Sequence, residues 1–188
     1  MKFTTREETF VLIKPDVLER ALFGRIFQKF EDADLKIEAI KTVKSTKELA
    51  YKHYLYDRIH IKTVGKKALF EFEKENLNAK KLLGTENPEI IGARILKWSR
   101  EYITKVKVIA CILSGPHAIE RVKQIVGITN PFEAERGTIR GDFGIDLQYN
   151  LVHGSDSVEN AGKEISIFFS PEEIFNYPRD IDRWVTGA

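Results

Sequence analysis

Residues Gly137–Ser157, GTIRGDFGIDLQYNLVHGSDS, contain the pattern that organises this chain around one histidine. The apolar pair Leu151–Val152 runs directly into His153, and Gly154 follows it. This pattern predicts a short buried strand that ends on the histidine, with a sharp chain turn at the glycine. The sequence therefore predicts an imidazole held at the end of a strand.

The residues after this histidine predict a helix. Either Asp156 or Ser157 is expected to cap it, with Glu159 placed for a capping box from Asp156. The apolar face of the helix is formed by Val158, Ala161, Ile165 and Phe168. Glu164 lies at the edge of that face, where a glutamate is usually a solvated residue.

A histidine at this junction can act on phosphorus. Neutral histidine is a competent nucleophile near pH 7, because its unperturbed pKa is about 6.5. Phosphoryl transfer depends mostly on positioning and on positive charge around the moving group. Arg140, which stands between Gly137 and Gly141, can supply a bidentate guanidinium fork. The alternative is that His153 is a satisfied core histidine, the commoner situation for a lone histidine.

His153 belongs to one of three motifs that are separated along the chain. They are VLIKPD ending at Asp16, GTIRGDF starting at Gly137, and NLVHGSDSVENAGKEI starting at Asn150. They resemble the nucleoside diphosphate kinase family, whose hallmark is a histidine in NxxHGSDS. We expect an α/β (α+β) fold of the ferredoxin-like type, an antiparallel sheet in βαββαβ order with helices on one face and a helical insert. Residues 1–188 would form one such kinase domain.

The resemblance implies a role for several site residues. His153 would be the nucleophile, Ser155 and Glu164 would orient its ring, and Glu164 would bond the ring nitrogen opposite the nucleophilic one. Tyr54 matches the family's active-site tyrosine, although core packing would also explain it. The positions implied to bind nucleotide are Lys14, Lys123, Thr129, Arg140, Asn150 and Ile95. Of these, Asn150 would contact ribose.

Lys14, Lys123 and Thr129 can also be interpreted from their own surroundings in the sequence. Lys14 stands at the tip of the strand Thr9–Ile13, where a lysine would otherwise be read as solvated. Lys123 stands where the family carries an arginine, so it supplies charge without a planar fork. Thr129 belongs to GITNP, which resembles the family's GxTNP. In that motif the threonine binds phosphate and the proline belongs to a loop used for subunit contacts.

Other elements are predicted from hydrophobic spacing and capping signals. The expected helices are Pro15–Asp32, Ser45–Tyr56, His117–Val126 and Ser170–Asn176, and the expected strands are Leu35–Lys44 and Val106–Leu113. His117 is expected to be a surface or capping residue. Trp184, near the C-terminus, would need a surface to cover it.

Residues at about 57–92 depart from the family pattern and read as a helical insert. Val64–Leu77 predicts one helix, Asn78–Lys81 and Gly84 its end, and Pro88 the start of another near Glu89. We expect this insert on the outer wall of the nucleotide cleft.

The sequence does not determine which residue clamps the nucleobase. The family uses a phenylalanine, and Ile95 stands at the aligned position. The clamp would then be rebuilt from Trp98, Tyr56 or a residue of the insert. Stacking between apolar groups reads no base edges, so we expect broad base tolerance.

Composition and absent motifs exclude several classes of protein. The formal charge of +2 over 188 residues is too small to make nucleic acid the main partner. No GxxxxGK[ST], GxGxxG or G-x-S-x-G pattern occurs, which excludes a P-loop, a dinucleotide fingerprint and a nucleophile elbow. The histidines and the cysteine show no zinc spacing, which argues against a metal cage, although His53 and His60 could share a helix face. The single cysteine, Cys111, would pack as a small hydrophobe. No apolar run is long enough to span a membrane, and we expect a cytoplasmic protein.

The resemblance implies nucleoside diphosphate kinase activity by a ping-pong mechanism through a phosphohistidine on His153. The partners would be nucleoside tri- and diphosphates, and Mg²⁺ would arrive with the nucleotide, with Asp156 the nearest residue to its water shell. A homo-oligomer, hexamer or tetramer, is also implied. The alternative is a catalytically weak paralogue that acts as a nucleotide- or nucleic-acid-binding regulatory module, for which the insert and Lys123 leave room.

Overall fold

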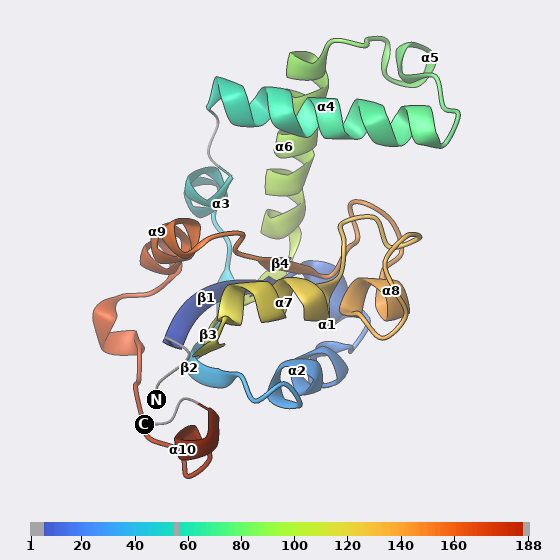
Figure 1. Cartoon of the computed structure of the whole chain (residues 1–188). Helices are drawn as coiled ribbons and strands as arrows, with labels where there is room; N and C mark the ends of the chain where they lie inside the picture. The colour runs from blue at the N-terminus through green and yellow to red at the C-terminus, as the bar shows by residue number, and fades with distance from the viewer. Residues whose placement is uncertain (1–5, 55–56, 186–188) are drawn as a thin grey trace. The chain divides into compact units, whose positions relative to one another are not determined.

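The computed structural model of the chain describes residues 6–54 and 57–185. It divides into two compact units. One, the sheet unit, comprises Met1–Ser45 and Val106–Ala188; the other, the helical unit, comprises Thr46–Lys105. Figure 1 shows all the strands in the first and a set of helices in the second.

The sheet unit is built on four antiparallel strands in the order β2-β3-β1-β4. Its strands are β1 (Arg6–Ile13), β2 (Lys36–Lys44), β3 (Lys107–Pro116) and β4 (Val152–Gly154). Its helices are α1 (Pro15–Glu19), α2 (Phe23–Glu31), α7 (Ala118–Val126), α8 (Ile139–Phe143), α9 (Val158–Phe168), the 3₁₀ turn η1 (Pro171–Glu173) and α10 (Asp182–Val185). This order and pairing confirm the ferredoxin-like antiparallel sheet with packed helices.

The central strand β1 is buried on both faces. Val11 and Ile13 belong to a core cluster that includes Phe30 of α2. Phe10 points the other way, because side chains alternate along a strand, and its ring stacks on Phe168 of α9 at 4.7 Å. Helices therefore cover both faces of the sheet, and the expectation of helices on one face is wrong. A continuous apolar strand needs cover on both sides.

The predicted helix Pro15–Asp32 is two helices, α1 and α2. Ala21 lies between them with φ 53°, a left-handed conformation that cannot continue a right-handed helix. The apolar spacing of four is preserved across the break, which is why the pattern alone reads as one helix.

The cap of α9 is Ser157, whose Oγ accepts a hydrogen bond from the backbone N of Asn160 at 3.2 Å. The predicted capping box from Asp156 is wrong, because the cap is Ser157 and the residue three positions after it is Asn160, not Glu159. Glu159 accepts a bond from Lys163 at 2.7 Å. The helix expected at Ser170–Asn176 is shortened to the single turn η1.

The helical unit contains α3 (Lys47–His53), α4 (Arg58–Lys74), α5 (Ala79–Leu83) and α6 (Pro88–Lys105). The helix predicted over Val64–Leu77 starts earlier, because Asp57 caps α4 by accepting a bond from the backbone N of His60 at 2.6 Å. Where only a helix end was predicted, Asn78 caps the additional helix α5 and Gly84, with φ 74°, terminates it.

Helices α4 and α6 meet at two glycines. A Cβ atom on Gly65 would lie 1.8 Å from the carbonyl oxygen of Pro88, and one on Gly92 would lie 1.9 Å from that of Ile61. Only glycine permits so close a backbone approach. Within residues 6–54 and 57–185, none of the helices combines the length and apolarity needed to cross a bilayer.

Candidate active site

His153 lies on β4, opposite Leu12 of β1 in the antiparallel register. Its Nε2 lies 2.6 Å from Oε1 of Glu164, which α9 projects toward it. The second carboxylate oxygen of Glu164 accepts a hydrogen bond from the hydroxyl of Ser155. Ser155 is itself buried, and its Oγ accepts a bond from the backbone N of Phe10 at 3.3 Å. The ring, the carboxylate and the hydroxyl thus form one chain of contacts anchored on β1.

This contact selects the tautomer of the imidazole. A carboxylate can only accept hydrogen bonds, so the Nε2 of His153 is the protonated nitrogen in the neutral ring. The lone pair then lies on Nδ1. Glu164 is therefore not a solvated helix glutamate, because its Oε1 lies 2.6 Å from the ring.

Lys14 lies at the end of β1, as the sequence predicts. Its Nζ donates to Oδ1 of Asn150 at 2.6 Å, and its backbone N donates to the carbonyl of Leu151 at 2.9 Å. Burial and then the nearby charge of Arg140 lower the pKa of Lys14 to about 8, while the carboxylate of Asp16 acts in the opposite direction. The lysine therefore remains mostly protonated at neutral pH.

Arg140 of α8 joins two backbone segments, one at Gly127 and one at Asn150–Val152. Its guanidinium donates to the carbonyl oxygens of Gly127 at 2.7 Å, Asn150 at 3.2 Å and Val152 at 2.6 Å. All three nitrogens of the guanidinium take part, so the side chain clamps the strand that carries His153. The sequence predicted the cation but not this use of it.

The remaining predicted residues of the sheet unit lie at its surface. Lys123 is exposed on α7, where its Nζ donates to Glu120 at 3.0 Å, and Thr129 is exposed in the turn that follows. Asp156 precedes α9, and its Oδ1 accepts a bond from Asn160 at 2.7 Å. That bond is the main reason why the pKa of Asp156 is lowered, and the nearby His153 adds to the effect.

The comparison with protein families decides the affiliation. The family model described as nucleoside diphosphate kinase matches residues 7–93 and 89–174. The chain belongs to the nucleoside diphosphate kinase family. A nucleoside diphosphate kinase from Listeria monocytogenes is 38% identical over 95% of this chain and 99% of its own length. One from Pyrococcus horikoshii is 38% identical over 94% of this chain and 93% of its own length.

Solved nucleoside diphosphate kinases share the fold. An NDP kinase from Pyrobaculum aerophilum, 33% identical, superimposes with a TM-score of 0.86 over 92% of this chain and 100% of its own. The enzyme from Borrelia burgdorferi with bound vanadate and ADP, a transition-state mimic, is 28% identical, with a TM-score of 0.73 over 96% of both chains. This chain is therefore an enzyme of phosphoryl transfer between nucleotides, and the regulatory alternative is not favoured.

Two residues assigned from the family pattern belong to the helical unit. Tyr54 ends α3, where its carbonyl accepts hydrogen bonds from Arg100, and Ile95 is partly buried on α6. Trp98, a candidate for the base clamp, is 45% exposed on the same helix. Tyr56, the other named candidate, lies outside the described residues. The parts of Tyr54 and Ile95 in the kinase site stay predictions.

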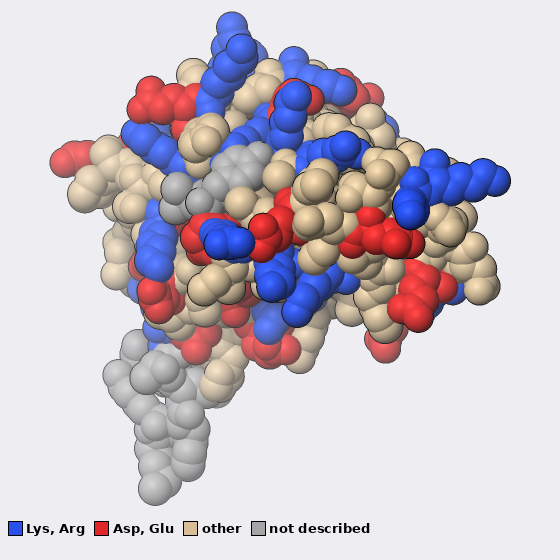
Figure 2. Space-filling view, turned by 90° about the horizontal axis from the view of Figure 1, so that it is seen from above, with Lys and Arg blue, Asp and Glu red and all other residues tan. Residues whose placement is uncertain are grey.

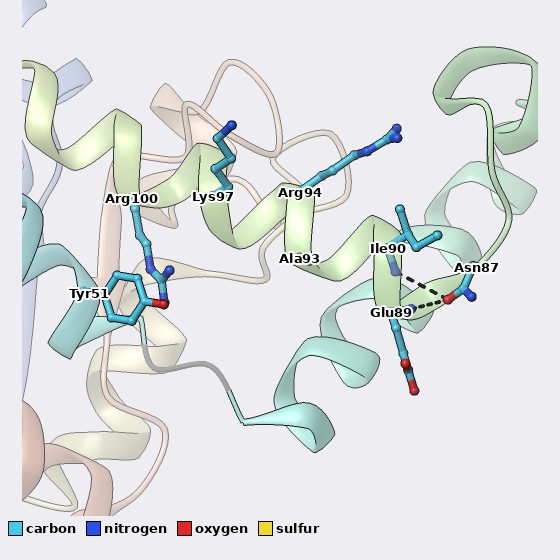
Figure 3. A pocket seen from close by; sticks show the side chains of 8 residues that line it. All are labelled: Tyr51, Asn87, Glu89, Ile90, Ala93, Arg94, Lys97 and Arg100. Carbon is cyan, nitrogen blue, oxygen red and sulfur yellow. Dashed lines mark hydrogen bonds between the residues drawn. The ribbon is translucent and has the colours of Figure 1, made fainter.

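The helical unit also has an open pocket with a volume of about 760 Å³ (Figure 3). It is lined by Tyr51, Asn87, Glu89, Ile90, Ala93, Arg94, Lys97 and Arg100. Its cations do not converge on a common point: Arg94 donates to the carbonyl of Leu83 at 2.6 Å, and Arg100 stacks on the ring of Tyr51 at 3.7 Å. Figure 3 shows Arg94 and Lys97 extending away from Tyr51. These contacts join helices, so we do not assign the phosphates to this pocket.

Sequence reasoning missed one buried residue beside the strand of His153. Asp16 is only 3% exposed, and its Oδ2 accepts a hydrogen bond from the backbone N of Leu151 at 3.2 Å. A signal was present, since Asp16 is the last letter of the VLIKPD motif. Spacing along the chain, however, does not reveal that it contacts a residue next to the strand of His153.

Proposed function

We propose that His153 carries the phosphoryl group of a ping-pong nucleoside diphosphate kinase. Nδ1 of the neutral ring attacks the γ-phosphorus of a nucleoside triphosphate, the N–P bond forms, and the bond to the bridging β,γ-oxygen breaks. The nucleoside diphosphate leaves with that oxygen. A second nucleoside diphosphate then attacks the phosphohistidine, which restores the neutral ring.

The observation that carries this proposal is the 2.6 Å contact between His153 Nε2 and Glu164. A carboxylate on Nε2 directs the lone pair to Nδ1 and stabilises the positive charge that develops on the ring during attack. Ser155 holds the other oxygen of Glu164 and so limits its rotation. Ser155 and Glu164 are in this way positioned to orient the nucleophile.

Binding of the triphosphate is assigned to cationic and polar groups around the strand of His153. Lys14 and Arg140 lie beside that strand, Lys123 is exposed on α7, and Thr129 is exposed in the segment that follows α7. Asn150 would contact the ribose. Side chains must supply the positive charge here, because the chain has no P-loop. The family pattern also assigns Tyr54 and Ile95 to the nucleotide site, and both assignments stay predictions.

The residues present also fit a Mg²⁺ ion that arrives with the nucleotide. Asp156 is an ionised carboxylate whose lowered pKa reflects its bond from Asn160, and its charge also interacts with His153. Oxygen ligands of this kind suit Mg²⁺, which usually keeps several waters. When bound, the ion would neutralise phosphate charge, while Asp156 would hold its water shell.

We also propose that residues 1–188 form one kinase domain with a helical insert. Helices α4 and α5 fall within the insert expected at about 57–92 of a single kinase domain. Association into a homo-oligomer is supported by two large apolar side chains, Phe132 at 81% and Trp184 at 76% exposure. A cytoplasmic location is supported by the one buried, unpaired cysteine, Cys111.

Intact-mass measurement after incubation with ATP tests the phosphohistidine. We expect one added phosphoryl group, acid-labile, located on His153, and removed when GDP is supplied. His153→Asn should show none of this, whereas His117→Asn, an exposed histidine at the start of α7, should behave as wild type. Folded protein that acquires no acid-labile label would end the proposal.

A further inference from the structure

The strand that carries His153 begins from a strained residue. Leu151 has φ 72°, a left-handed conformation that a non-glycine residue rarely adopts, and its side chain is fully buried. It directly precedes β4, the strand Val152–Gly154. The conformation of Leu151 therefore sets the direction in which the strand, and with it the imidazole, leaves the preceding loop.

The segment Lys14–Asp16 holds this residue from both sides. The carboxylate of Asp16 accepts a hydrogen bond from the N–H of Leu151, and the N–H of Lys14 donates to the carbonyl of Leu151. Lys14 and Asp16 lie at the start of α1. Asp16 precedes Leu151 by 135 positions in the sequence. The strained conformation is thus maintained by the turn that also presents Lys14.

Hydrogen bonding alone does not account for a carboxylate at this position. Asp16 is 3% exposed, and burying a charge is costly unless other charges balance it. Two cations, Lys14 and Arg140, lie in the same network, and each disfavours the charge of the other. Asp16 is the carboxylate that opposes this effect on Lys14.

We propose that Asp16 is a positioning residue for phosphoryl transfer: its carboxylate holds the left-handed Leu151 that directs the strand of His153, and its negative charge opposes the effect of Arg140 on the neighbouring Lys14. This inference rests on the proposed function of His153. It assigns Asp16 no contact with the substrate. Both of its effects pass through other residues, one through the backbone and one through Lys14.

The two effects are separated by Asp16→Asn, which keeps an oxygen acceptor for Leu151 and removes the charge. The measurement is the single-turnover rate of His153 phosphorylation by ATP between about pH 6 and 10. Without the carboxylate, the positively charged form of Lys14 is less favoured, so the alkaline limb of the profile should move down by about one pH unit. Below about pH 7 the rate should stay within a few-fold of wild type. Glu19→Gln, an exposed carboxylate on the same helix, makes the same change in net charge and should leave the limb in place.

Removal of both effects requires Asp16→Ala. Misplacement of the ring by about 1 Å should lower the phosphorylation rate about 100-fold at pH 6.5, where Lys14 is mostly protonated. Nucleotide affinity should change far less than the rate. Recovery of most of the rate in Asp16→Asn, the conservative variant, would show that the acceptor for Leu151 is what matters at that pH.

The outcomes are distinguishable from failure of the kinase proposal. Wild-type protein that is never phosphorylated overturns the function of His153 and this inference with it. If wild type is phosphorylated, a folded Asp16→Asn variant with an unshifted alkaline limb overturns the charge-balancing role. Asp16→Ala with an unchanged rate overturns the positioning role. Should Asp16→Ala fail to fold, the profile of Asp16→Asn decides.

Discussion

The sheet unit and the helical unit are stabilised in different ways. In the sheet unit, four consecutive residues of β1, Phe10–Ile13, are completely buried, and helices cover them on both faces. In the helical unit, Gly65 is the only described buried residue of the 17-residue helix α4. This helix approaches α6 closely at Gly65 and Gly92. The difference shows that the residues around His153 lie on the better buried framework.

Their charges differ as well. Thr46–Lys105 contains 13 Lys and Arg against 8 Asp and Glu, a formal charge of +5, so the rest of the chain carries −3 of the total of +2. On the face drawn in Figure 2, basic and acidic side chains nevertheless lie next to each other. A positive helical unit favours the approach of anionic nucleotides, which the total charge conceals.

The close approach of α4 and α6 at Gly65 and Gly92 allows the strongest test of the difference in stability between the two units. Gly92→Ala would place a Cβ 1.9 Å from the carbonyl of Ile61, which neither backbone can accommodate without moving. We expect a loss of about 3 kcal/mol in stability, concentrated in the helical unit. Native-state hydrogen exchange should show amides of α4 and α6 losing protection while those of β1 and β3 keep theirs.

The matched control is Gly162→Ala on α9, where an added Cβ meets no atom within 4 Å. It should be neutral or slightly stabilising, because alanine favours helix more than glycine does. Equal losses of protection in β1 and α4 after Gly92→Ala would contradict the contrast between the units.

Within the sheet unit, Glu164→Gln should slow phosphorylation of His153 about 100-fold, because an amide stabilises a developing imidazolium less than a carboxylate does. Nucleotide affinity should stay close to wild type, as measured by binding of a non-hydrolysable analogue. Glu159→Gln, an exposed change on the same helix, should have no such effect. A large loss of affinity with unchanged chemistry would show that Glu164 binds substrate instead.

Lys14 should make activity and stability respond to pH in opposite directions. Its pKa is lowered from 10.5 to about 8 in the folded protein, so between these values the unfolded chain binds more protons than the folded one. The contribution of Lys14 to the free energy of unfolding therefore rises from about pH 8 to 10.5, while the loss of its charge reduces phosphate binding.

The check is urea denaturation of wild type and Lys14→Met across that pH range, together with phosphorylation rates. The stability difference between the two proteins should change with pH. The corresponding difference for Lys163→Met, an exposed lysine on α9, should not. Parallel pH curves for Lys14→Met and wild type would contradict the lowered pKa.

The smallest effect is expected from Lys123→Arg. Lys123 is exposed, and its ion pair is with a neighbour on its own helix, Glu120, so the longer side chain can be accommodated. Steady-state turnover should be similar or up to a few-fold higher, since a guanidinium binds phosphate oxygens in pairs. A collapse of turnover would mean that the family geometry is not kept around α7.

Local pattern was sufficient where one segment decides its own structure. The apolar pair before His153 predicts β4, and the spacing of Val158, Ala161, Ile165 and Phe168 predicts α9. Local pattern failed where the packing of distant segments determines the local structure. Ala21 interrupts an apolar spacing that reads as one helix, and the choice between Asp156 and Ser157 as the cap of α9 was open until the backbone was seen.

The amino-acid sequence by itself determined the family, the histidine at the end of a strand, and the lysine at the tip of another, because these depend on residue identity and short-range periodicity. The tertiary structure decided that Asp16 holds Leu151 and that Arg140 binds backbone carbonyls. It also decided that two glycines let α4 approach α6. These contacts join residues from 10 to 135 positions apart in the sequence, and their separation in space is set by the packing of the whole unit, which no local pattern encodes.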